Sequence, residues 1–231
     1  TGEAVLPALM DRFLVTAQIV LLSVSVAMII AIPLGMLAAW KQNSSTDFLI
    51  TSVIILSLSL PSFWVGIMLI LYFGVTLEWL PTVGYATLSE GFCLHMSYLV
   101  LPVSSLVLGE MATITRMMRS STIETLRLEY ITHARAKGIK ESIVLRRHAF
   151  KNSFAPSLTV LGLILGHLLG GAAVTETVFS LPGLGRFMVE SIYARDYPVV
   201  QGAMLLIAGI YVFVNLIIDL LYPIFDPRVK L

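Results

Sequence analysis

Two long apolar runs without any charged side chain, residues 13–40 and 48–77, constrain the fold of this chain more than any other feature. A helix that crosses the hydrocarbon core of a bilayer needs about 20 predominantly apolar residues, and each run exceeds that length. Only 13% of the 231 residues are charged, whereas soluble domains carry about 25%. The chain is therefore predicted to be an integral membrane protein.

Three further apolar runs, residues 92–115, 153–175 and 199–218, complete the predicted set of spans. We predict one all-α domain over residues 1–231, a polytopic transmembrane helical bundle with five spans. Pro61 lies within the second span, where a neighbouring helix can satisfy the carbonyl that the proline leaves without a partner.

A polar stretch from Arg116 to Pro156 separates the third span from the fourth and holds nine of the fifteen Lys and Arg residues. Cytoplasmic loops of membrane proteins carry an excess of basic residues. We therefore expect the loop at about 116–153 and the C-terminus to face the cytoplasm. With five spans the N-terminus then faces outward although no signal peptide precedes it, so a further span upstream of this sequence is expected.

Within this loop the sequence predicts two short helices. The tetrapeptide Ser-Thr-Ile-Glu at 121–124 fits a capping box at a helix start. Residues 129–137 begin with an acid and end with a base, which suits the helix dipole, and Gly138 follows as a C-cap. A second helix is expected from about Lys140 to Asn152. Capped helices favour a docking surface, although a basic loop that only fixes the topology is the alternative.

Polar groups within the predicted spans are candidates for a translocation path. Ser59 and Ser62 flank the kink at Pro61, and His167 lies in the middle of the fourth span. An ionisable residue inside a membrane is a functional candidate by default, and a neutral histidine that is hydrogen-bonded to a neighbouring helix is the alternative. Glu110 in the third span is expected near the cytoplasmic boundary, in a structural pairing.

Three glycines of the fourth span, Gly162, Gly166 and Gly170, share one helix face and are typical of close helix packing. No metal site is predicted. His167 has no second ligand one helical turn away, and the lone Cys93 excludes every site built from several cysteines.

The segment at 176–198 connects the last two spans on the outward side. Glu176 and the turn-forming residues Pro182, Gly183 and Gly185 predict a compact re-entrant or gating loop, and an ordinary turn is the alternative. The Gly-Leu-Gly triplet in this segment is not a phosphate-binding loop, since no strand precedes it.

Several ordered motifs give this chain a resemblance to a known family. They are ARAKG at 134–138, HAFKN at 148–152 followed by Pro156, TETVFSLPGLGR at 175–186, RDYPVVQG at 195–202, and NLIIDLLYPIFDPR at 215–228. From about residue 13 onward the chain resembles the permease subunits of ATP-binding-cassette importers, in the dipeptide, oligopeptide and nickel group. The general signature of these permeases has Glu-Ala-Ala where this chain has Thr132, His133 and Ala134, so only the last residue matches. Family members also have a further N-terminal span.

The resemblance implies the architecture of a type I importer permease, and it assigns a coupling role to the cytoplasmic loop. In that family a short helix of this loop sits in a groove of the ATPase subunit and moves with it. The matching positions here are Glu129, Tyr130, Ala134, Arg135, Ala136, Lys137 and Gly138. In this arrangement Ala134 and Ala136 permit close approach, while Arg135 and Lys137 contact the ATPase or lipid headgroups.

The resemblance also implies the location and the partners of the chain. It predicts a multi-pass protein of the bacterial inner membrane that works with a second homologous permease, two ATPases and an extracytoplasmic solute-binding protein. ATP and Mg²⁺ belong to the ATPases, so the chain itself is expected to bind membrane lipid but no cofactor and no nucleic acid, and to be no enzyme. The solute is a peptide, nickel or a related small molecule, which the binding protein selects. A secondary transporter and a membrane-embedded enzyme are the alternative classes.

Overall fold

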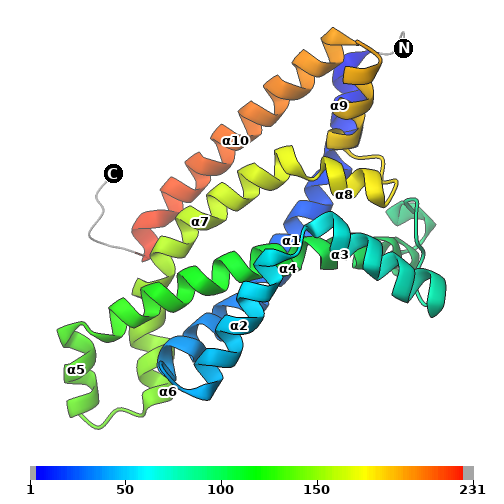
Figure 1. The fold of residues 1–231 in the computed structure, drawn as a ribbon. Helices are drawn as coiled ribbons and strands as arrows, with labels where there is room; N and C mark the ends of the chain where they lie inside the picture. Colours follow the sequence, from blue (N-terminus) through cyan, green and yellow to red (C-terminus); the bar gives the residue numbers. More distant parts are fainter. Residues whose placement is uncertain (1–3, 226–231) are drawn as a thin grey trace.

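The computed structural model describes residues 4–225, and every regular element among them is a helix. Four of these helices are long and apolar enough to cross a membrane. A fifth span results if the bent pair at Ser45–Ser59 and Ser62–Thr76 is counted as one. The predicted all-α transmembrane bundle is therefore confirmed, and Figure 1 shows its course.

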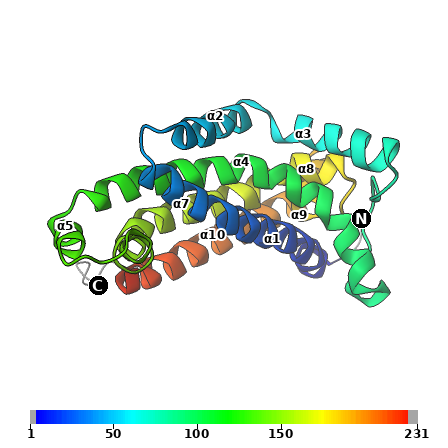
Figure 2. The same ribbon diagram turned by 90° about the horizontal axis from the view of Figure 1, so that it is seen from below.

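Helices α1 (Val5–Trp40) and α4 (Phe92–Leu126) pack against each other through the centre of the bundle. Helix α7 (Phe150–Gly171) contacts both of them, and α10 (Tyr197–Phe225) packs against α7. In Figure 2, α2 (Ser45–Ser59) and α3 (Ser62–Leu69) lie along one side of α4, whereas α10 lies on the opposite side of the bundle.

The second predicted span is not one continuous helix. Helix α2 ends before Leu60, and α3 starts after Pro61 and continues as the π-helix η1 (Ile70–Thr76). The two halves are bent by 94°. A residue before a proline avoids helical backbone, and Leu60 has an extended ψ of 123°. The kink expected at Pro61 is thus a complete break.

Helix α4 corrects two predictions about the central loop. The helix does not stop near residue 115 but continues to Leu126, because Thr122 and Thr125 on its last turns are buried against the chain. Ser121 therefore lies inside a helix, where its carbonyl accepts a hydrogen bond from the Thr125 hydroxyl at 2.8 Å. The capping box predicted at 121–124 is wrong.

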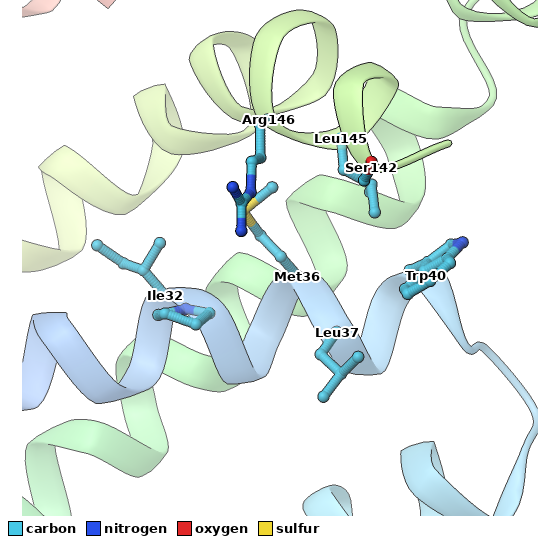
Figure 3. A pocket seen from close by; sticks show the side chains of 8 residues that line it. Ile32, Met36, Leu37, Trp40, Ser142, Leu145 and Arg146 are labelled. Carbon is cyan, nitrogen blue, oxygen red and sulfur yellow. The ribbon is translucent and has the colours of Figure 1, made fainter. Parts of the chain in front are cut away.

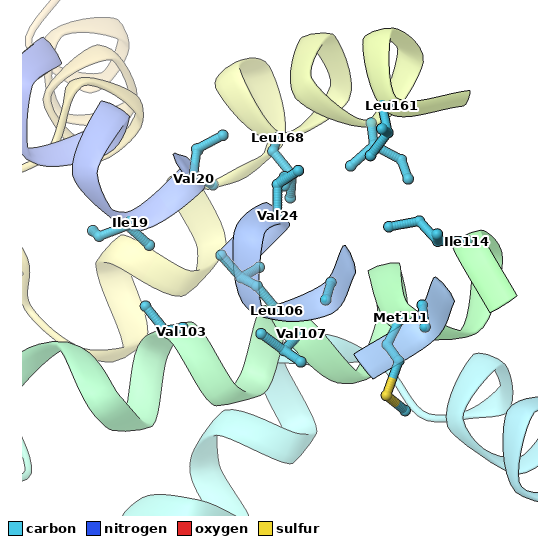
Figure 4. Packing of buried hydrophobic residues seen from close by; sticks show 14 of the residues in the cluster. Ile19, Val20, Val24, Val103, Leu106, Val107, Met111, Ile114, Leu161 and Leu168 are labelled. Atoms are coloured by element: carbon cyan, nitrogen blue, oxygen red, sulfur yellow. The ribbon is translucent and has the colours of Figure 1, made fainter. Parts of the chain in front are cut away.

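The main core lies where α1, α4 and α7 meet, and Figure 4 shows its side chains. Val24 of α1 lies between Leu106 of α4 and Leu168 of α7, and Ile19 and Ile114 extend the same cluster toward its two ends. Small residues let the two central helices approach closely. A Cβ atom added at Gly35 would lie 2.6 Å from the Met118 Cβ, so no larger residue fits there without displacing α4.

The glycine stripe of α7 packs in part as predicted. A Cβ atom at Gly162 would lie 2.7 Å from the Ile218 side chain of α10, and one at Gly166 would overlap the Tyr211 ring. Gly170 has no neighbour within 4 Å of such an atom. Two of the three glycines therefore allow α10 to rest on α7.

Short helices occupy the two ends of the molecule (Figure 1). At one end lie α5 (Glu129–Ala136), α6 (Glu141–Ile143) and the π-helix η3 (Val144–Ala149). The second loop helix predicted for 140–152 does not end there, since residues 141–170 form one span-length helix. At the other end lie η2 (Leu88–Glu90), α8 (Ala173–Val178) and α9 (Leu184–Tyr193).

Candidate functional site

Helix α5 is closed by a glycine in the left-handed region. Gly138 has a φ of 74°, and its N–H donates to the Arg135 carbonyl at 2.9 Å. The Ile139 N–H donates to the Ala134 carbonyl at 3.4 Å, which completes a Schellman motif. The predicted helix at 129–137 and its glycine C-cap are confirmed, with Lys137 as the last residue before the turn.

The inner face of α5 fixes it to the start of the next span. Ile131 and Ala134 are buried against Val144 and Ala149. The Tyr130 hydroxyl donates to the His148 carbonyl at 3.1 Å and accepts a hydrogen bond from the Asn152 side chain at 2.8 Å. These contacts hold α5 against η3, which leads directly into α7.

The outer face of α5 is the part that another protein can reach. Glu129, Arg135, Ala136, Lys137 and Gly138 are exposed, but Ala134 is only 6% exposed. The close approach expected of both alanines is therefore possible at Ala136 and not at Ala134, which packs inside the chain.

One of the two basic side chains on this face is engaged within the chain. The Arg135 guanidinium donates both Nε and Nη2 to the Glu141 carboxylate, and these hydrogen bonds raise the pKa of Arg135 above its ordinary value. Because the pair is exposed, it contributes little to stability and serves to orient the loop between α5 and α6. Lys137 makes no such pair in the described chain.

A buried carboxylate organises the outward segment at the opposite end. The Glu176 side chain is completely buried and accepts hydrogen bonds from the Thr16 hydroxyl at 2.5 Å and the Arg186 N–H at 2.8 Å. Thr16 in turn accepts one from the Leu184 N–H at 2.8 Å. Glu176 and Thr16 thereby cap the first turn of α9, where backbone N–H groups lack helical partners.

The two glycines of this segment are required by close contacts. Gly183 precedes α9, and a Cβ atom there would overlap the Glu176 carboxyl group. At Gly185 such an atom would lie 2.7 Å from the Ala173 Cβ. The segment is a folded pair of helices bound to α1 through Thr16, which is more than the ordinary turn considered as an alternative.

Burial raises the pKa of Glu176 above its ordinary value, and hydrogen bonds from Thr16 and from the N–H groups of Arg186 and Gly185 oppose that rise. Burial is the larger effect, so the folded state favours the protonated form more than the unfolded chain does.

A groove of about 540 Å³, mostly apolar but with several polar side chains, lies at the break between α2 and α3. Ser57, Ser62, Glu110, Thr113 and His167 contribute the polar part of its lining, and leucine, isoleucine and valine side chains contribute the rest. The groove is open on one side. The structure therefore brings together Ser62 and His167, two of the three predicted path residues.

The third predicted path residue, Ser59, does not line the groove. Its hydroxyl donates to the Ile55 carbonyl of its own helix at 2.9 Å, which is a common structural role of a serine in a membrane helix. Ser59 of α2 and Ser62 of α3, on the two sides of the break at Pro61, therefore have different surroundings.

Glu110 also lines the groove, although the sequence predicts only a structural pairing for it near the cytoplasmic boundary. Helix α4 continues to Leu126, so Glu110 lies in the middle of the helix. Glu110 makes no hydrogen bond or ion pair with the described residues and lies within electrostatic range of His167. An acid inside an apolar run was the signal in the sequence that could have marked it as a groove residue.

An ion pair between the polar connection at 41–47 and α4 was not predicted. The Arg119 Nε and Nη2 each lie 2.7 Å from an oxygen of the Asp47 carboxylate, in a bidentate arrangement. Asp47 also accepts from the Asn43 N–H at 3.0 Å, and Ser44 caps α2. This pair fixes the start of α2 against the end of α4 that leads into α5.

Comparison with known proteins places these features in one family. The model of the family described as "Binding-protein-dependent transport system inner membrane component" matches residues 31–231.

Among the described residues, no group of three or more His, Cys, Asp or Glu side chains is arranged to hold a metal ion.

Curated relatives share about two fifths of their residues with this chain. A Brucella abortus (strain 2308) protein named for peptide transport is 40% identical over 229 residues, which is 99% of this chain and 73% of that protein. The oligopeptide permease AppB of Bacillus subtilis (strain 168) is 39% identical over 99% of this chain and 73% of its own length. The dipeptide permease DppB of Alkalihalophilus pseudofirmus is 38% identical over 100% and 75%.

Solved structures agree in fold. A chain of the MetNI methionine transporter in an inward-facing conformation has a TM-score of 0.80 with 16% identity, over 98% of this chain and 100% of that one. A chain of an amino acid ABC transporter has a TM-score of 0.60 with 19% identity, over 99% of this chain and 100% of that one. These structures confirm the predicted importer-permease fold, and the family match and the named relatives confirm the resemblance noted in the sequence.

Proposed function

Because this chain belongs to the family of binding-protein-dependent transport system inner membrane components, we propose that it carries peptides across the membrane as a permease subunit of an ATP-binding-cassette importer. The relatives described above are named for peptide, oligopeptide and dipeptide transport, which supports a peptide as the solute. None of these three names mentions nickel, the other solute of the resemblance.

The observation that carries this proposal is the construction of α5. One face of the helix is buried on η3, the other is exposed, and Gly138 closes the helix with a defined turn. Such a helix transmits a push from an ATPase to α7 as a rigid body. We assign the contact with the ATPase to Glu129, Ala136 and Lys137, and we assign the support of α5 from within to Tyr130 and Ala134.

The complete transporter contains a second permease, two ATPases that bind ATP and Mg²⁺, and an extracytoplasmic binding protein. The open side of the groove at Ser62, Glu110 and His167 supports a path that a second permease closes. The passing peptide then meets these side chains between the two subunits. The segment held by Glu176 forms the outward gate, at the end of the bundle opposite α5.

The orientation is part of the proposal. The excess of basic residues in the central loop puts α5 in the cytoplasm, where the ATPases are. A cysteine at Ala136, in a Cys93→Ser background, tests this directly, because both positions are exposed. In intact cells the new cysteine should resist an impermeant maleimide and react after the membrane is opened. Labelling of this cysteine in intact cells would show that α5 faces outward and would refute the proposed orientation.

The coupling role is tested in the complete transporter, reconstituted with its binding protein. Gly138→Val forces a β-branched residue to a φ of 74° and should reduce peptide uptake and peptide-stimulated ATP hydrolysis together. Gly91→Val is the matched control, because Gly91 also has a positive φ, of 129°, and open space around it, but lies at the start of α4.

A disulfide or short bifunctional crosslink from Ala136→Cys to the ATPase groove should form, and Gly138→Val should reduce it. Equal uptake by the Gly138→Val and Gly91→Val variants would refute a coupling role for α5. The absence of any crosslink from Ala136→Cys would refute the assigned contact.

A further inference from the structure

A second groove runs along the outside of α1, away from the polar path. One part, of about 350 Å³, is lined by residues of α1 between Ile32 and Trp40 and by Ser142, Leu145 and Arg146. A neighbouring hollow of about 400 Å³ continues from Ile32 and Pro33 to Ser25. Because the two hollows share Ile32 and Pro33, they form one continuous surface groove, which we call the α1 groove.

The length and lining of the α1 groove fit an acyl chain. Residues 25–40 of a helix extend over about 22 Å, and one leaflet of the hydrocarbon core is about 15 Å thick. Met28, Ile29, Ile32 and Met36 make the groove almost entirely apolar. The groove is therefore longer than one leaflet is thick, so a linear hydrocarbon that spans one leaflet can lie along α1.

The polar end of the α1 groove fits an anionic headgroup. Figure 3 shows Arg146 reaching from η3 toward Met36, with Trp40 further along α1 on the side of Ser142. Arg146 is exposed and makes no hydrogen bond or ion pair with a described residue, and the nearby Glu141 carboxylate is already bound by Arg135. Arg146 thus places a positive charge beside an apolar groove, without a counter-charge among residues 4–225 that the structure describes.

The depth of this end in the membrane is marked by an aromatic residue. Trp40 is 44% exposed at the end of α1, and the Lys41 ammonium lies 5.9 Å from its ring centre. Tryptophan and lysine in this order are typical of the level of lipid headgroups. Arg146 therefore lies where a lipid phosphate is found, and the apolar part of the groove extends from there into the bilayer.

We propose that the α1 groove binds one anionic phospholipid, with its phosphate on Arg146 and one acyl chain along residues 25–37. The observations that favour a lipid over a protein segment are the apolar lining of the groove, the Arg146 cation beside it without a described partner, and the interfacial residues Trp40 and Lys41 near its end. Through Arg146 the lipid contacts η3, which also supports α5, so the bound lipid stabilises the contact between α1 and the coupling segment.

The test uses the complete transporter in nanodiscs of phosphatidylcholine that contain a minor fraction of phosphatidylglycerol with a photoactivatable diazirine in its acyl chain. After irradiation, adducts are mapped by mass spectrometry of peptides. They should be concentrated in residues 25–40. The exposed apolar face of α10, which includes Leu205, Val212 and Leu216, reports ordinary contact with bulk lipid.

Two arginine variants separate a specific site from general attraction. Arg146→Gln should reduce phosphatidylglycerol adducts on residues 25–40 by about fivefold, the effect of one cation near an anionic headgroup. Arg147→Gln removes the neighbouring exposed charge, which does not line the groove, and should leave the adducts unchanged. With a phosphatidylcholine probe of the same acyl chain, the two variants should differ little.

A third variant tests the apolar part of the α1 groove. Ile29 is 73% exposed, so Ile29→Trp should fold normally, fill the groove and reduce adducts from both probes. Equal labelling of α1 and α10, or equal effects of Arg146→Gln and Arg147→Gln, would overturn the proposal. Adducts that appear only after the other subunits are removed would also overturn it, since a protein would then be the occupant.

Discussion

Removal of the Thr16 hydroxyl should destabilise the protein far more than the size of the change suggests. In Thr16→Val the shape of the side chain is kept, but the two short hydrogen bonds are lost, the 2.5 Å bond to Glu176 and the 2.8 Å bond from the Leu184 N–H, together with a long one of 3.4 Å to the Arg12 carbonyl. Thr16 is completely buried, so no water can replace the hydroxyl. Both former partners remain, and both are left with unsatisfied polar groups.

The magnitude follows from these two losses. A hydrogen bond to a charged group contributes about 1.5 to 3 kcal/mol, and a buried N–H without a partner costs about 1 to 3 kcal/mol. Since the new methyl group recovers part of this through apolar contact, we expect a net loss of about 2 to 4 kcal/mol in the free energy of unfolding. For a chain of this size that corresponds to a fall of about 4 to 16 °C in Tm.

The assay is thermal unfolding in detergent, followed by circular dichroism, with Thr177→Val as the matched control. Thr177 is exposed, and its hydroxyl bonds only to the Ala173 carbonyl of its own helix at 2.7 Å, so its loss should cost less than about 1 kcal/mol. The double variant Thr16→Val with Glu176→Gln should be less destabilised than the sum of the single variants, because the two residues share one network. Equal Tm values for Thr16→Val and Thr177→Val would refute the reasoning.

Three further predictions concern the pH response, the path and the ion pair. Because the pKa of Glu176 is raised in the folded state, the unfolded chain loses this proton first as the pH rises above about 4.5. The free energy of unfolding should therefore fall until the pH passes the folded pKa. Glu176→Gln should flatten this part of the Tm-against-pH curve, and parallel curves for the two proteins would contradict this prediction. Glu110→Gln and His167→Leu should each reduce peptide uptake at unchanged Tm and assembly, whereas Leu163→Ile in the same groove should not; normal uptake by both variants would exclude the path assignment. Asp47→Asn should lower Tm more than Glu190→Gln, whose partner Arg186 is in an exposed pair, since Asp47 is 5% exposed and bidentate; equal Tm values would show that the buried pair contributes no more than the exposed one.

Much of the helical architecture was determined by the sequence itself. Inside a bilayer every backbone N–H and C=O must be satisfied within the segment, so a long uncharged apolar run has few alternatives to a helix. The four continuous spans were predicted for this reason, whereas the short helix before Gly138 was predicted from its terminal charges and its glycine C-cap. Gly138 adopts a positive φ because its own neighbours require the turn, and no distant contact is needed.

The tertiary structure alone decided which polar side chains meet. Thr16 and Glu176 are 160 positions apart, and Asp47 and Arg119 are 72 apart, so no local pattern announces either pair. The same holds for Ala134, which turns inward because of how α5 rests on η3. Glu110 and His167 line one groove because α4 and α7 pack against each other, and no local pattern announces that packing. Helix formation depends on neighbours within one turn, whereas the register between helices depends on packing along their whole length, and that register decides what each buried polar group contacts.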